Sequence, residues 1–152
     1  MKAKKRDGKK NEMKLRLPSL SVNESVARAT VAAFCAQIDP AASELADIKC
    51  VVSEAVTNCI VHAYRETVGI IYITVAIYED NSVKIEIKDK GVGIEDVSLA
   101  RQPLYTTDAE SERSGMGFTV MESFTDKIRV TSKPGKGTGV VMYKKIRGRD
   151  GV

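Results

Sequence analysis

The chain of 152 residues lacks the sequence features of several classes of protein. It has no apolar run of about 18 residues, the length of a membrane span, and no apolar segment directly follows its charged N-terminus, as a secretory signal would require. It has three cysteines, Cys35, Cys50 and Cys59, but no CxxC pair, and only one histidine. This pattern favours buried thiols over disulfides or a zinc site. We therefore expect a cytoplasmic protein that does not associate with a membrane.

The net positive charge comes from the two ends of the chain. Of the net charge of +4, residues 1–10 contribute +5 and residues 144–152 contribute +3, which leaves residues 11–143 with −4. A nucleic-acid-binding domain would carry a basic stripe on its folded surface, so we expect no direct contact with nucleic acid. We interpret residues 1–10 as a basic disordered tail and residues 147–152 as a flexible tail, flanking a single domain over residues 11–146.

Hydrophobic periodicity predicts an α+β fold. The predicted elements are a strand over residues 11–19, helices over 21–38 and 39–64, a hairpin over 70–91, a short helix over 118–124 and a closing hairpin over 126–146. Along the strands, apolar and polar residues alternate, so one face of the sheet is apolar and the other is wet. This predicts a two-layer α/β sandwich, with helices packed on one face of a mixed, mostly antiparallel sheet.

The segments between these elements carry two kinds of local signal. Ser21 and Glu24 form a capping-box pattern before the first helix, and Asp39 is a good N-cap for the second. Residues 94–114 show no clean period. A loop of this length in a small domain is typical of a lid or binding loop.

The second predicted helix carries an acid and an amide on the same face. Glu54 and Asn58 are four residues apart, so their side chains are neighbours on the helix surface. A buried carboxylate needs a partner, a proton or a cleft. An amide oxygen is a suitable ligand for Mg²⁺, which takes one or two protein groups together with phosphate oxygens and water. His62, one turn further along, is expected to be packed or hydrogen-bonded rather than a ligand.

Two glycine-containing segments are the other candidates for a binding site. Asp89 ends a predicted strand and is followed by Gly91 and Gly93, while residues 115–117, "GMG", precede a short helix. Glycines before a helix leave backbone N–H groups accessible to an anion such as phosphate, although each segment alone is typical of a tight turn. The chain has no GxxxxGK[ST] motif and no GxGxxG between a parallel strand and its helix. A P-loop and a dinucleotide fingerprint are therefore excluded.

The order of these segments resembles the Bergerat-fold, or GHKL, ATPases, which include gyrase B, histidine kinases and the MutL proteins. Residues 54–58, "EAVTN", resemble the N box; residues 89–93, "DKGVG", and 115–117, "GMG", resemble the first two G boxes. Residues 135–139, "GKGTG", resemble the third turn, which includes a threonine near the adenine. "VSEAVTNCIVHAY" and "ARQPLYTTDAESERSGMGFTVMESF" resemble, more specifically, the anti-sigma serine kinases of spore-forming bacteria, over about residues 11–146.

This resemblance implies a serine/threonine-protein kinase that binds ATP or ADP with Mg²⁺. It makes Glu54 the general base, Asn58 the Mg²⁺ ligand, and Arg113 the group that stabilises charge at the γ-phosphate. Asp89 would bind the exocyclic amine of adenine, and Thr138 would assist through water. The other residues implied at the nucleotide are Gly91, Gly93, Thr106, Thr107, Ser114, Gly115, Met116 and Gly117, with Arg101 as a further lid candidate.

The resemblance also implies protein partners. One is a sporulation-type RNA polymerase sigma factor, held inactive, and the other is an anti-anti-sigma protein whose serine is phosphorylated. A homodimer is expected, and the first helix around Glu24 and Arg28 is a candidate docking surface. Three alternatives remain at this point: an anti-sigma kinase of a general-stress system, a histidine-kinase ATP domain without its dimerisation helices, and a non-catalytic nucleotide-sensing module. The single histidine, His62, lies within the N-box helix and is not an obvious phospho-acceptor.

Overall fold

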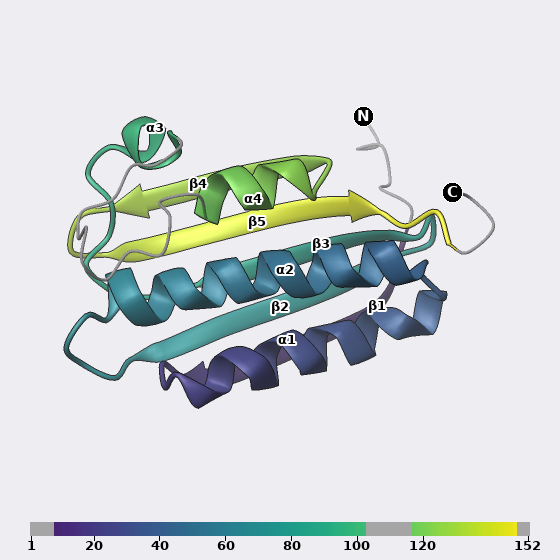
Figure 1. Cartoon of the computed structure of the whole chain (residues 1–152), viewed down its shortest axis with the longest axis horizontal. Coiled ribbons are helices and arrows are strands. Elements are labelled where there is room, and N and C mark those ends of the chain that lie inside the picture. Colours follow the sequence, from purple (N-terminus) through teal and green to yellow (C-terminus); the bar gives the residue numbers. More distant parts are fainter. Residues whose placement is uncertain (1–7, 103–116, 149–152) are drawn as a thin grey trace.

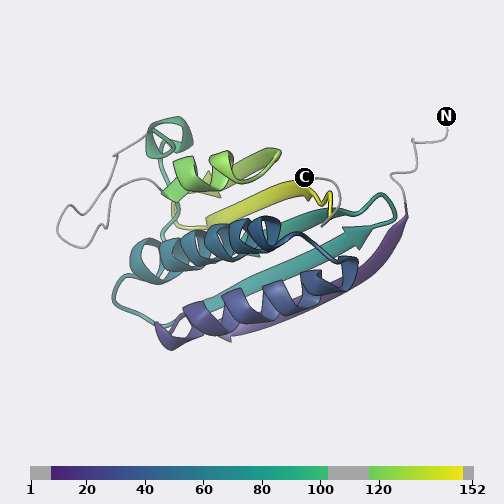
Figure 2. The same ribbon diagram turned by 45° about the vertical axis from the view of Figure 1, so that its right-hand side comes forward.

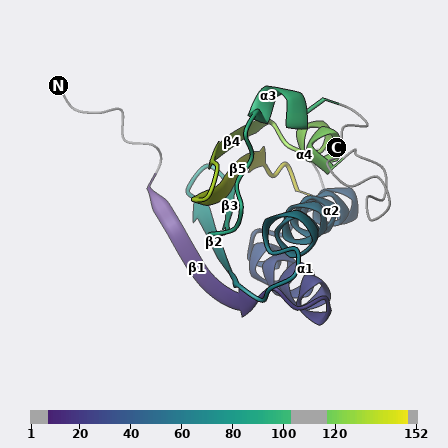
Figure 3. The same cartoon turned by 90° about the vertical axis from the view of Figure 1, so that its left-hand side faces the viewer.

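The structure is a computed structural model and describes residues 8–102 and 117–148. Its described elements form two layers (Figure 1). One layer is a five-stranded sheet, and helices α1, α2 and α4 lie together on one of its faces (Figure 3). The predicted two-layer α+β sandwich is confirmed.

The sheet is built from four antiparallel pairings. Its strands, in spatial order, are β1 (Lys9–Pro18), β2 (Ile70–Tyr78), β3 (Ser82–Lys88), β5 (Gly137–Lys145) and β4 (Lys127–Lys133). Both predicted hairpins are present, as β2–β3 and β4–β5. The sheet was expected to be mixed, yet the described strands include no parallel pair. β3 and β4 run in the same direction, but β5 lies between them and pairs with both.

The helices follow the predicted order with one local change. The helical segments are α1 (Val22–Cys35), a 3₁₀ turn (Ala36–Ile38), α2 (Ala42–Asn58), a π-helical segment (Cys59–Ala63), α3 (Val97–Ala100) and α4 (Gly117–Ser123). The single helix predicted over residues 39–64 is therefore an α-helix that widens into a π-helical turn. Short π-helical turns often occur at functional sites.

Of the two predicted helix caps, the first is confirmed in position but not in its side-chain bonds, and the second is wrong. Ser21 is the N-cap residue of α1 but makes no side-chain capping bond, because its backbone is helical (φ −54°, ψ −36°) rather than extended. The Glu24 carboxylate accepts hydrogen bonds from Arg28 (3.0 Å) and from Ser53 of α2 instead. Asp39 has φ of 52° and ends the 3₁₀ turn. The N-cap of α2 is Ala41, whose N–H donates to the Glu44 carboxylate at 2.9 Å.

The core lies between the sheet and the two long helices, with α2 over its centre (Figure 2). Ile48, Val52 and Val56 of α2 are fully buried in the same cluster as Ile73 and Ile85 of the sheet. Burying an aliphatic side chain of this size contributes about 1.5–3 kcal/mol. This packing fixes α2 over the sheet, so that the end of α2 lies beside the segment that follows β3.

The described structure extends slightly beyond the predicted domain at both ends. β1 begins at Lys9, two residues before the predicted strand, because Lys9 is in register with Tyr78 of β2. After β5, the N–H groups of Arg147 and Gly148 donate to the Glu44 carboxylate at 2.7 and 3.0 Å. The first two residues of the predicted C-terminal tail are thus attached to the start of α2. Residues 1–7 and 149–152 lie outside the described residues.

Candidate nucleotide site

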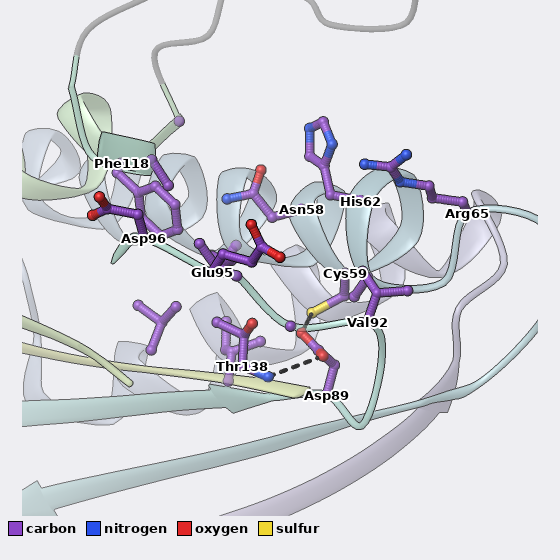
Figure 4. A pocket seen from close by; sticks show the side chains of 18 of the residues that line it. Asn58, Cys59, His62, Arg65, Asp89, Val92, Glu95, Asp96, Phe118 and Thr138 are labelled. Atoms are coloured by element: carbon purple, nitrogen blue, oxygen red, sulfur yellow. Dashed lines mark hydrogen bonds between the residues drawn. The ribbon is translucent and has the colours of Figure 1, made fainter. Parts of the chain in front are cut away.

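A cavity of about 320 Å³ opens at the C-terminal end of α2 (Figure 4). Volumes of this order are typical of sites for small organic ligands. Its walls come from the end of α2, the π-helical segment, the residues after β3, α3, the start of α4 and β5. The predicted site residues that line it are Asn58, Asp89, Gly93, Gly117 and Thr138.

Asp89 lies on the floor of this cavity, with only 8% of its surface exposed. Its Oδ1 accepts hydrogen bonds from the N–H groups of Gly91 (2.9 Å) and Thr138 (3.1 Å). Its Oδ2 faces the Cys59 thiol, with 3.6 Å between Sγ and Oδ2. Burial raises the pKa of Asp89 above its ordinary value, and these three donors oppose that rise. Asp89 is thus a buried carboxylate with two backbone donors on Oδ1 and the Cys59 thiol beside Oδ2.

The two glycines after Asp89 are required by packing. A Cβ on Gly91 would lie 2.3 Å from the carbonyl oxygen of Ala63, at the end of the π-helical segment. Gly93 has a φ of +76°, and its Cβ would lie 2.1 Å from the carbonyl oxygen of Lys133. The glycines therefore let this turn approach the helix end and the β4–β5 turn. The prediction that they leave room for the base and ribose stays a prediction.

The start of α4 faces the N-box residues. A Cβ on Gly117 would lie 3.4 Å from both amide atoms of Asn58 and 3.4 Å from Oε2 of Glu54. Residues that are about 60 positions apart in the sequence are thus brought together at one end of the cavity. Among the described residues, no group of three or more His, Cys, Asp or Glu side chains could hold a metal ion. One amide oxygen together with phosphate oxygens and water does fit the ligand preference of Mg²⁺.

A hydroxyl pair links the third turn to the beginning of the lid. Thr138 Oγ1 lies 2.8 Å from Ser132 Oγ, which accepts a hydrogen bond from the N–H of Ile94 at 2.8 Å. Ser132 also donates to the carbonyl of Gly137 at 3.0 Å. The sequence reasoning missed Ser132, since its position in β4 carries no motif, although the alternation of that strand places it on the same face as Val130.

The structure describes only the first residues of the predicted lid. Its first residues form α3, where the Asp96 side chain accepts a hydrogen bond from the N–H of Leu99 at 3.0 Å. Arg101 forms an ion pair with Glu122 of α4, which accounts for it without a ligand. Arg113, Thr106, Thr107, Ser114, Gly115 and Met116 lie outside the described residues.

Several charged or titratable side chains in the cavity wall were not predicted to lie there. They are His62 and Arg65 from the helix end, and Glu95 and Asp96 from the root of the lid. Cys59, expected only to be a buried thiol, is indeed 3% exposed but also lines the cavity. Its position next to Asn58 in the sequence was the one available signal. Its proximity to Asp89, 30 residues away, was not visible in the sequence.

Sequence comparisons identify the family. A model of the histidine kinase-like ATPase domain matches residues 17–144. The anti-sigma F factor of Caldanaerobacter subterraneus is 59% identical over 90% of this chain and 94% of that protein, and the one from Clostridium acetobutylicum is 51% identical over the same shares. The chain belongs to the anti-sigma F factor family. These relatives confirm the resemblance of the chain to the anti-sigma F factors.

Solved structures agree on the fold of this anti-sigma F family member. The crystal structure of the RsbU and RsbW domains of a Mycobacterium tuberculosis protein matches with a TM-score of 0.67 and 20% identity, covering 90% of this chain and 32% of that one. The histidine kinase domain of a blue-light activated kinase from Erythrobacter litoralis matches with a TM-score of 0.56 and 17% identity, covering 81% and 61%. The GHKL fold is confirmed. The chain is an anti-sigma factor with a nucleotide-binding, kinase-type domain, and no helix within its described residues is long and apolar enough to span a membrane.

Proposed function

We propose that this chain binds and inhibits a sporulation sigma factor, and that it uses ATP and Mg²⁺ to phosphorylate a serine of an anti-anti-sigma protein. The observation that carries the proposal is the position of Gly117, whose Cβ would lie 3.4 Å from both Asn58 and Glu54. A predicted metal ligand and a glycine of the second G box therefore meet in the wall of a ligand-sized cavity, and the predicted base lies beside them. The family name of the relatives supports the sigma-factor part.

The nucleotide would lie along the cavity between Asp89 and Asn58. The oxygen of Asp89 that contacts Cys59 accepts a hydrogen bond from the exocyclic amine of adenine, and Thr138 contacts the base through water. Gly91 and Gly93 hold the turn beneath the base. The amides of residues 115–117 would hold the phosphates, and Asn58 would bind Mg²⁺, which when bound would supply positive charge for phosphoryl transfer.

Glu54 removes the proton from the attacking serine. It stands one helical turn before Asn58, so the proton acceptor and the metal ligand share one helix face. General base catalysis contributes about 10²–10⁴ in rate. Arg113 stabilises the developing charge at the γ-phosphate, and Thr106, Thr107, Ser114 and Met116 complete the contacts of the lid with ATP.

The partners dock on α1 around Glu24 and Arg28. These two side chains form an ion pair of 3.0 Å, and Glu24 also accepts a hydrogen bond from Ser53, the residue before Glu54. A docked partner that separates this pair would act close to the proposed base. The chain acts as a homodimer in the cytoplasm.

Transfer of labelled phosphate from ATP to a purified anti-anti-sigma protein tests this function. We expect label on a serine of that protein, a rate reduced by about 10²–10⁴ in Glu54→Gln, and nearly unchanged ATP affinity in that variant. Glu66→Gln, which changes an exposed acid beyond the π-helical segment, is the matched control and should transfer normally. Label on His62, or ATP binding without transfer to the partner, would contradict the kinase proposal.

A further inference from the structure

A buried thiol is in contact with the carboxylate on the cavity floor. The Sγ of Cys59 lies 3.6 Å from Oδ2 of Asp89, and both residues line the cavity. Figure 4 shows the sulfur directed toward the carboxylate, below Asn58 and His62. Neither the N box nor the first G box assigns a task to residue 59.

The helix end that carries this thiol is also hydrogen-bonded to the turn after Asp89. Cys59 is the first residue of the π-helical segment. The carbonyl of Ala63, the last residue of that segment, accepts the N–H of Val92 at 3.1 Å, and the hydroxyl of Tyr64 accepts the N–H of Lys90 at 2.6 Å. The backbone after Asp89 and its side chain are therefore both held by the same helix end.

The two oxygens of Asp89 differ in their partners. Oδ1 accepts two backbone N–H groups, from Gly91 and Thr138, while the printed contacts of Oδ2 within the described residues comprise the Cys59 thiol alone. A carboxylate oxygen has about two acceptor positions, and a thiol is a weak donor. Oδ2 can therefore accept a hydrogen bond from an amine of a ligand while the Cys59 thiol holds the carboxylate in place.

We propose that Cys59 is a positioning residue that aims Oδ2 of Asp89 into the cavity and so sets the preference for a purine that carries an exocyclic amine. This rests on the proposed function, in which the cavity takes ATP.

The charge state of Asp89 gives the proposal a readout beyond affinity. Burial raises the pKa of Asp89, and the Gly91 and Thr138 N–H groups and the Cys59 thiol lower it. Loss of the thiol should therefore raise this pKa further. The other titratable or charged side chains around the carboxylate are Tyr64 on the helix end, Lys90 beside it in the turn, and His62, Arg65, Glu95 and Asp96 in the cavity wall. They are unchanged in the variants below.

The test compares ATP with purine riboside triphosphate, which lacks the exocyclic amine, across a pH series by titration calorimetry. In Cys59→Ala we expect ATP to bind about two- to fivefold more weakly, the range for loss of a weak hydrogen bond. Affinity for the amine-free nucleotide should be unchanged, and the pH below which ATP binding fails should move upward. Cys59→Ser, which keeps a donor, should retain the wild-type preference. Cys35→Ala, which removes a fully buried thiol elsewhere in the core, is the matched control.

The outcomes separate this inference from the proposed function. A wild-type chain that binds neither nucleotide overturns both. A wild-type chain that binds ATP, with a Cys59→Ala variant that loses both nucleotides equally or keeps the wild-type pH profile, overturns the inference alone and leaves Cys59 with a packing role. Thermal unfolding of the three variants identifies losses that arise from misfolding, and Cys59→Ser then decides through its nucleotide preference.

Discussion

Glu44 and Asp89 are both buried to 8% exposure, yet their surroundings have opposite effects. Glu44, at the start of α2, accepts three backbone N–H groups spread over both of its oxygens. Although burial raises its pKa, these donors bring the pKa of Glu44 below its ordinary value. Asp89 faces the end of the same helical stretch, has two N–H donors on one oxygen and a thiol on the other, and keeps a raised pKa.

The two acids differ both in the distribution of their donors and in how strongly burial desolvates the carboxylate, and together these differences separate a structural acid from a candidate binding acid. A buried carboxylate whose oxygens are both occupied by backbone N–H groups stabilises the fold and has little capacity for a ligand. One oxygen with a single weak donor keeps acceptor capacity and lines a cavity. Replacing each acid in turn tests this contrast between Glu44 and Asp89.

The largest expected effect is on the fold. Glu44→Ala leaves three backbone N–H groups without their acceptor, and we expect the free energy of unfolding to fall by about 3 kcal/mol. ATP affinity, extrapolated to fully folded protein, should not change. Urea denaturation and calorimetry measure the two quantities, with the exposed Glu66→Ala as the control. Equal losses of stability in both variants would remove the structural role of Glu44.

The second effect concerns ligand binding. Asp89→Asn should weaken ATP binding by about ten- to a hundredfold, the cost of losing a charged acceptor. The new amide directs its oxygen to the N–H groups of Gly91 and Thr138, so its NH₂ group faces the amine of the ligand. Unfolding free energy at neutral pH should not fall, because a neutral group replaces a buried charge. Normal ATP affinity would remove Asp89 from the base site.

The smallest effect is the opposite pH dependence of the two acids. The lowered pKa of Glu44 means that its stabilisation is present above its unfolded pKa of about 4.3 and is lost as the pH falls through the folded value. The raised pKa of Asp89 means that its contribution is largest below about pH 3.9 and is lost as the pH rises through its folded value. Stability curves of Glu44→Gln and Asp89→Asn should therefore depart from wild type with opposite slopes. Slopes of the same sign would refute the contrast.

The sequence predicted the elements well because their periods are regular. β2 and β3 alternate cleanly, and α2 carries an unbroken apolar stripe, so their types and order follow from local pattern. The capping box predicted for the first helix is absent. The Glu24 carboxylate accepts hydrogen bonds from Arg28 and from Ser53 of another helix, so it does not complete the box with Ser21.

The site was predictable only as far as its motifs extend. Asn58, Asp89, Gly93, Gly117 and Thr138 meet at one cavity as the boxes implied. Cys59 and Ser132 were missed, because neither belongs to a box and because their contacts with Asp89 and Ile94 join residues 30 or more positions apart in the sequence. The packing reasons for Gly91 also required the fold, since Ala63 approaches it from the helix end.

The insertion of β5 between β3 and β4 sets the order of events on the ribosome. β3 and β4 leave the ribosome before β5, yet neither can pair with the other across the gap that β5 fills. The Asp89 carboxylate also lacks its hydrogen bond from the N–H of Thr138 until β5 is in place. A chain that ends before β5 thus carries the N box and the first two G boxes without an assembled nucleotide site, and β5 must be translated before that site exists.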